Sequence, residues 1–195
     1  MELTPGDAVF EPDVDRWVPV PLDFPARDWS TATQWAENVT EGLAPYWELT
    51  DLQRADLAHM ALVVASTEPP LPGAIARFWH LPVVPDVSRV VHAYAEPLEQ
   101  DWTERLAEWA TGGYEGAVFQ RSEELTSTVY ARLFRTSALW PLPGAEDGAA
   151  AAVLRVLGEI EDMIVVIEII DLDITIAARL LQPATELAES IRLGA

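Results

Sequence analysis

The run Met163-Ile-Val-Val-Ile-Glu-Ile-Ile170 decides how the rest of the chain can fold. It is rich in β-branched residues and apolar except at Glu168, and its length suits a strand but cannot span a bilayer. A continuous apolar run of this length is typical of a strand that is covered on both faces. We therefore predict a central β-strand here, with other elements packed against each of its two faces.

The segments on either side of this strand extend the prediction. A second apolar run at 149–157 precedes it, and the polar segment 158–162 is short enough to close an antiparallel hairpin. Beyond the central strand, Asp171 or Asp173 can cap a C-terminal helix. The apolar residues of this helix recur at helical spacing, and they are Ile176, Ala177, Leu180 and Leu181.

The N-terminal part is predicted to be helical after an extended start. Prolines make residues 1–26 an extended lead-in, in which residues 16–22 can lie along a sheet edge. Two helices, between Ser30 and Pro45 and between Thr50 and Thr67, then form a helical hairpin. The face of the second helix expected to be buried consists of Leu52, Ala55, His59, Leu62 and Val63.

The middle of the chain supplies the remaining strands and one inserted helix. We predict this helix at 98–110, ended by two glycines, and strands at 74–81, 87–95, 116–123 and 128–137. Short links favour antiparallel pairing, so the expected fold is α+β, with a meander of about six strands. The order of elements resembles PsbP/Mog1-like α/β/α sandwiches and helix-grip domains of the Bet v 1 type, and this resemblance implies an architecture without a function.

Length and composition narrow the possible functions. A chain of 195 residues is enough for one domain, which we predict to span 1–195. Its 12 basic residues, all arginine, face 32 acidic ones, for a formal charge of -20, so nucleic acid and membrane surfaces are poor partners. Because the chain has neither cysteine nor lysine, disulfides, thiolate nucleophiles and Schiff-base chemistry are excluded.

The sequence offers little support for a secreted protein, a metal centre or a catalytic motif. The N-terminus has no basic and apolar leader, and we expect a cytoplasmic protein. His59 is interpreted as a core residue, while His80 and His92 lie on two arms of a predicted hairpin without a third ligand nearby. We therefore assign no catalytic residue, no metal and no cofactor.

In the three strands predicted at 128–137, 149–157 and 163–170, successive side chains point to opposite faces of the sheet. One row of side chains is purely apolar, and the other contains single charges. Because the second row is otherwise apolar, it must be covered by helices, by a second subunit or by a ligand. Glu168 would be costly to bury unpaired, so we predict an ion pair with Arg155 or Arg132. The candidate ligand- or interface-binding residues are Tyr130, Arg132, Phe134, Arg155, Glu168 and Trp79.

Three functional hypotheses follow from these features. The first is a non-enzymatic binding or accessory protein, a homodimer that uses an apolar sheet or helix face against a protein partner. The second is a small-molecule-binding or enzymatic domain, in which Arg132 and Arg155 hold a small anionic ligand between sheet and helices. The third is an acidic mimic that occupies a basic site on another protein.

Overall fold

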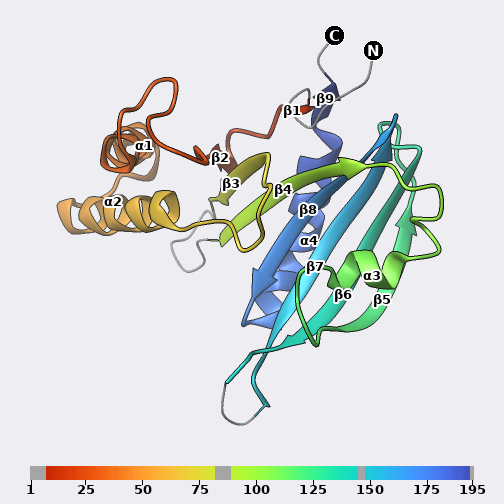
Figure 1. Ribbon diagram of the computed structural model, residues 1–195. Coiled ribbons are helices and arrows are strands. Elements are labelled where there is room, and N and C mark those ends of the chain that lie inside the picture. Colours follow the sequence, from red (N-terminus) through yellow and green to blue (C-terminus); the bar gives the residue numbers. More distant parts are fainter. Residues whose placement is uncertain (1–7, 82–88, 145–147, 194–195) are drawn as a thin grey trace.

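A seven-stranded antiparallel sheet dominates the computed structural model, which describes residues 8–81, 89–144 and 148–193 (Figure 1). The α+β class is thereby confirmed, with one strand more than the approximate six expected. In chain order the elements are β1 (Ala8–Phe10), β2 (Trp17–Pro19), α1 (Ala32–Trp47), α2 (Asp51–Ser66), β3 (Ala76–His80), β4 (Arg89–Pro97), α3 (Leu106–Thr111), β5 (Val118–Leu125), β6 (Arg132–Pro141), β7 (Ala150–Ile160), β8 (Met163–Asp171), α4 (Ile174–Glu189) and β9 (Ile191–Leu193).

The strand order differs from the predicted meander at one place. The order is β2-β3-β4-β8-β7-β6-β5, so two meanders join where β4 pairs with β8. The segment that contains α3 leads from β4 to the far edge of the sheet, where β5 begins. Short links could not reveal this crossover. The almost completely buried β8 needs a neighbouring strand on each side, and one of the two, β4, comes from a distant part of the chain.

One face of the sheet, which we call the inner face, packs against α4 (Figure 1). Of the two predicted caps, Asp171 and Asp173, it is Asp173 that caps α4, by accepting bonds from the backbone N–H groups of Thr175 and Ile176. Val165, Ile167 and Ile169 of β8 point into this layer and are almost completely buried. The prediction of a strand covered on both faces is confirmed, since Ile164 and Val166 are buried on the other side.

The opposite face, which we call the outer face, is covered by two separate parts of the same chain. The helical hairpin of α1 and α2 packs near the β2–β3 end, around Trp35 and Trp79. The segment around α3 lies over β6 and β7, where Trp102 packs edge-on against Phe134. Figure 1 shows α3 in front of the sheet, α4 behind it and the hairpin to one side.

Several predicted boundaries are corrected by the structure. Thr31, not Ser30, caps α1, and Pro45 lies inside this helix, which continues to Trp47. The inserted helix is much shorter than 98–110, because the chain before Leu106 forms turns. The polar segment 158–162 contributes only Glu161 and Asp162 to the hairpin turn, since β7 continues to Ile160.

The predicted buried face of α2 is wrong. His59 is exposed, Leu52 is 73% exposed and Val63 is 50% exposed. The buried residues are instead Leu57, Ala61, Val64 and Ala65. Apolar residues occur around much of this helix, so spacing alone could not decide which side meets the tryptophans of α1 and β3.

The two ends of the described chain meet in a small second sheet. β1, within the extended lead-in, pairs antiparallel with β9 after the C-terminal helix, a pairing that local sequence patterns did not predict. The predicted edge strand within residues 16–22 is confirmed as β2. None of the helices in the described residues is long and apolar enough to cross a membrane.

Candidate functional site

A row of polar side chains crosses the apolar outer face at right angles to the strands. Register pairs place the members opposite one another on adjacent strands, in the order Arg77, His92, Glu168, Arg155, Thr136 and Ser122. The four members Arg77, Glu168, Arg155 and Thr136 are buried, with exposures of 5% or less. We call this set the polar row. It runs from the helical hairpin to β5, the last strand in the order of the sheet.

The centre of the polar row is a buried ion pair. Arg155 Nε and Nη2 donate to Glu168 Oε2 at 2.8 and 2.5 Å, so the prediction that Glu168 pairs with Arg155 or Arg132 is confirmed for Arg155. The Tyr114 hydroxyl donates to Glu168 Oε1 at 2.7 Å, and the Tyr94 hydroxyl lies 3.4 Å from the same oxygen. Both carboxylate oxygens therefore have partners.

Arg155 also ties the α3 segment to the sheet. Its Nη1 donates to the carbonyl oxygen of Trp109, and its Nη2 donates to that of Gly112 at 2.6 Å. These carbonyls lie at the end of α3, where a cation is favourable because the helix leaves its last carbonyls unpaired. The guanidinium carbon also lies 5.4 Å from the centre of the Tyr114 ring. Arg155 thus joins β7, β8 and α3.

Burial and the Glu168 charge keep the two tyrosines protonated. Both effects raise the pKa of Tyr94 and of Tyr114 well above the ordinary value of 10.0, with burial the larger cause. A tyrosine that stays protonated can donate to a carboxylate but cannot serve as a general base at neutral pH. The hydroxyls therefore provide the hydrogen bonds to the Glu168 oxygen that Arg155 does not contact.

The other end of the polar row anchors the helical hairpin. Arg77 donates to the carbonyl oxygens of Thr67 and Pro21, and to that of Ala65 at 3.3 Å, which places its charge at the end of α2. Burial lowers the pKa of Arg77. His92 lies between Arg77 and Glu168 in register, and burial, followed by the Arg77 charge, lowers its pKa to about 4.

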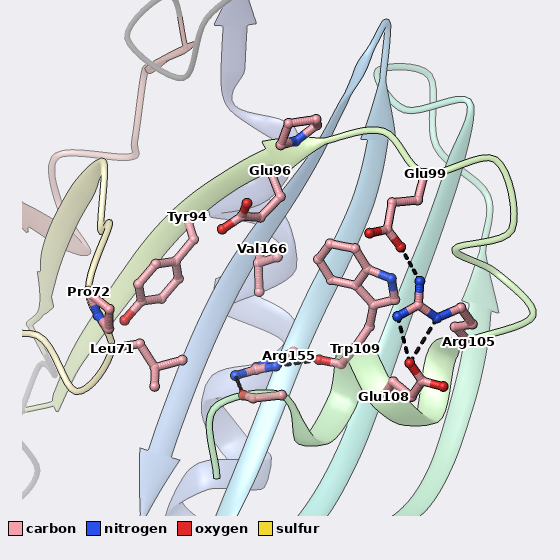
Figure 2. Close-up of a pocket in the computed structure, with 12 residues that line it drawn as sticks. Leu71, Pro72, Tyr94, Glu96, Glu99, Arg105, Glu108, Trp109, Arg155 and Val166 are labelled. Carbon is pink, nitrogen blue, oxygen red and sulfur yellow. Dashed lines mark hydrogen bonds and ion pairs between the residues drawn. The ribbon is translucent and has the colours of Figure 1, made fainter.

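Between the two covers, the outer face opens into a cleft of about 520 Å³. Figure 2 shows Tyr94 and Glu96 of β4 on one side, Trp109 and Arg105 on the other, and Arg155 at the base. The described residues that line the cleft are Leu71, Pro72, Tyr94, Glu96, Pro97, Glu99, Arg105, Glu108, Trp109, Gly112, Arg155 and Val166. We call this cavity the outer-face cleft.

A close contact joins the two walls of the outer-face cleft. Gly113 has φ +86°, and a Cβ atom there would lie only 2.5 Å from Leu71 Cδ2. The connection between α2 and β3 therefore packs directly against the turn that follows α3. This contact, together with the bonds of Arg155, holds the α3 wall in place.

The rim of the outer-face cleft is acidic, whereas most of the remaining lining is apolar and includes Leu71, Trp109 and Val166. The rim carries three glutamates, Glu96, Glu99 and Glu108, and one arginine, Arg105. The other arginine of the lining, Arg155, adds no net charge because Glu168 matches it. Arg105 Nη1 lies 2.5 Å from Glu99, and its Nη2 lies 2.7 Å from Glu108. Glu96 forms no ion pair within the described part of the chain. Three carboxylates against one guanidinium leave the rim with negative charge.

The sequence-derived candidates do not form one site. Arg155 lies in the outer-face cleft, and Glu168 lies directly behind it. Arg132 is on the same face but pairs with Glu124 at 3.1 Å and lies over the Phe134 ring. Trp79 packs under the helical hairpin. They are thus distributed across the width of the outer face.

Tyr130 lies on the other side of the sheet. β6 begins only at Arg132, so the alternation that would have placed Tyr130 beside Arg132 and Phe134 does not extend to it. Its ring packs over Gly158, and its hydroxyl donates to the carbonyl oxygen of Ala188 in α4 at 2.8 Å. Tyr130 is therefore part of the inner layer.

The histidines do not come together either. His80 contacts the Trp17 ring on the inner face, whereas His92 belongs to the polar row on the outer face. In the part of the chain that the structure describes, no three His, Asp or Glu side chains cluster as metal ligands would.

The residues that sequence reasoning missed are those that only the strand order brings to the cleft. Tyr94 and Glu96 lie on β4, and the prediction of a meander kept this strand away from β8. Trp109 and Arg105 come from the crossover segment around α3. One available signal was the alternation of His92, Tyr94 and Glu96 on an otherwise apolar strand.

Comparison with known proteins found no protein-family model that matches the chain and no curated protein similar to it in sequence.

Proposed function

We propose that this protein is a non-enzymatic binding protein that receives a basic, apolar-flanked segment of a partner protein in the outer-face cleft. The observation that supports this most directly is the combination of a mostly apolar lining with an acidic rim. Apolar surface provides binding energy through burial, and the surplus carboxylates favour a cationic group over an anionic one. The formal charge of -20 favours approach of a basic partner.

The chemistry of the cleft supports binding over catalysis. The described residues that line it include no serine, threonine, cysteine, histidine or aspartate. Arg155 makes four hydrogen bonds, two to Glu168 and one to each of two carbonyl oxygens, and the Tyr94 hydroxyl at the floor lies 3.4 Å from Glu168. The charge of Arg155 is already matched by Glu168, which argues against the anion pocket that was the alternative hypothesis from the sequence.

A small organic cation is the alternative ligand, because the volume of the cleft falls within the range of roughly 300–1,000 Å³ that is common for small-molecule sites. Arginine methyl ester is a suitable probe for this alternative. Binding of the ester as tightly as of an arginine-containing peptide would favour a small-molecule site, and much weaker binding would favour a peptide site.

Fluorescence anisotropy with labelled short peptides tests the proposal. We expect peptides with one arginine between leucines to bind, and matched peptides with glutamate in its place not to bind. Glu96→Arg should weaken binding roughly tenfold or more, because it reverses a charge at the rim. Glu104→Arg is the matched control, since Glu104 is exposed in the turns that lead into α3 and does not line the cleft. Equal binding of both peptides, or equal effects of the two variants, would refute the proposed site.

A further inference from the structure

The two edges of the large sheet differ in how well they are protected. β2, at one edge, has three residues and ends at Pro19, which cannot donate a backbone hydrogen bond. β5, at the other edge, has eight residues, contains no proline and has a β-strand on only one side among the described residues. A long edge strand of this kind is able to pair with another strand.

Two exposed and opposite charges stand on the inner-face side of β5. Arg121 and Glu123 lie opposite Ser137 and Arg135 of β6. Arg135 turns instead to α4, where it donates to Thr185 and Gln182. Neither Arg121 nor Glu123 has an ion pair or a side-chain hydrogen bond with the residues that the structure describes. Both charges are thus available to a partner.

We propose that β5 pairs antiparallel with β5 of a second copy of this chain, around a two-fold axis at Ser122. In this register Arg121 of each copy lies opposite Glu123 of the other, so the axis creates the same ion pair twice. An axis at Arg121 would bring two arginines together, and an axis at Glu123 would bring two glutamates together. Of these three registers, the charges favour the one centred on Ser122.

Two features of the chain weaken this contact and set the conditions for observing it. A bulge between Phe119 and Arg121 interrupts the regular ladder, so the fully regular part of the new pairing is short. The formal charge of -20 on each copy also opposes association. The dimer therefore dissociates on dilution, and it is best measured near physiological ionic strength, where a Debye length of about 8 Å screens distant charges.

Sedimentation velocity over a range of concentrations tests the proposal with charge-reversal variants. Weak contacts typically have dissociation constants in the micromolar range, so wild type should sediment as a dimer at a protein concentration of about 100 µM. Arg121→Glu and Glu123→Arg should each be monomeric, because each sets like charges opposite one another. Arg179→Glu on α4 and Glu104→Arg before α3 make the same charge changes at exposed positions outside β5, and they should remain dimeric.

A mixture of the two monomeric variants provides the decisive step. At positions 121 and 123, one copy then carries two glutamates and the other carries two arginines, so a heterodimer should form. The double variant R121E/E123R, which restores opposite charges, should again form a homodimer. Circular dichroism should show all variants folded, since both positions are exposed. A monomeric wild type, a dimeric Arg121→Glu, or a mixture that stays monomeric would each overturn the proposal.

Discussion

The inner and outer faces of the sheet are built from the same strands, and both covers pack through apolar side chains, but the covers of the outer face are also fastened by two buried arginines. On the inner face, continuous apolar side chains of β7 and β8 pack against one long helix, α4. On the outer face, Arg155 and Arg77 each fasten a separate segment through backbone carbonyls. Hydrophobic burial is not directional, whereas these hydrogen bonds fix particular atoms. The outer face can therefore leave a cleft open between its two covers.

Neighbouring residues on β8 allow the two faces to be compared directly. Glu168→Ala should lower the free energy of unfolding by about 4 kcal/mol, because it leaves Arg155 buried without its partner. Ile167→Val, which removes one methylene from the inner face, should lower it by only about 1 kcal/mol. Urea unfolding measures both values. A loss for Glu168→Ala no larger than that for Ile167→Val would show that the ion pair is not needed for the outer face.

Acid should affect the outer face through His92. The pKa of His92 is about 4 in the fold against 6.5 ordinarily, so the residue is neutral in the folded state and takes up a proton on unfolding below pH 6.5. Its contribution to stability is therefore complete above pH 6.5 and is lost as the pH falls towards 4. The loss should amount to at most about 3 kcal/mol.

The test for His92 compares unfolding free energies at several pH values. His92→Gln should remove this part of the pH dependence, whereas His59→Gln, on the exposed side of α2, should not. Glutamates and aspartates titrate in all three proteins, so the difference between each variant and wild type is the relevant quantity. Parallel curves for wild type and His92→Gln would contradict the expectation.

The smallest effect is expected for the other sequence-derived arginine. Arg132 pairs with Glu124 at the surface, where the two side chains are 41% and 56% exposed. Exposed ion pairs contribute roughly 0–1 kcal/mol, so Arg132→Ala should lower the unfolding free energy by about 0.5 kcal/mol. A loss comparable to that of Glu168→Ala would mean that the outer face depends on both arginines equally.

The sequence predicted the inner face better than the outer one. Continuous apolar runs and the Asp173 cap were sufficient to place β7, β8 and α4. The cost of burying Glu168 alone also predicted its ion pair, although not which arginine would provide it. These conclusions depend only on local patterns and on the requirement to neutralise a buried charge.

The cleft and the polar row could not be predicted in the same way. Both depend on β4 pairing with β8, a contact between segments far apart in the sequence that the preference for short links argued against. His92 and Tyr94 were visible as polar residues on a strand, but their neighbours were set by register. The position of α3 likewise depends on Arg155, whose contacts with Trp109 and Gly112 carry no local sequence signal.

Hydrogen exchange of Arg155→Leu, followed by mass spectrometry, is the most direct test of whether this one side chain holds the α3 wall of the cleft. We predict that residues 106–114 lose more of their protection than β6, β7 and β8, because the substitution removes both bonds to α3, whereas leaving Glu168 unpaired lowers protection throughout the fold. Unchanged protection of residues 106–114 in a folded variant would contradict the account.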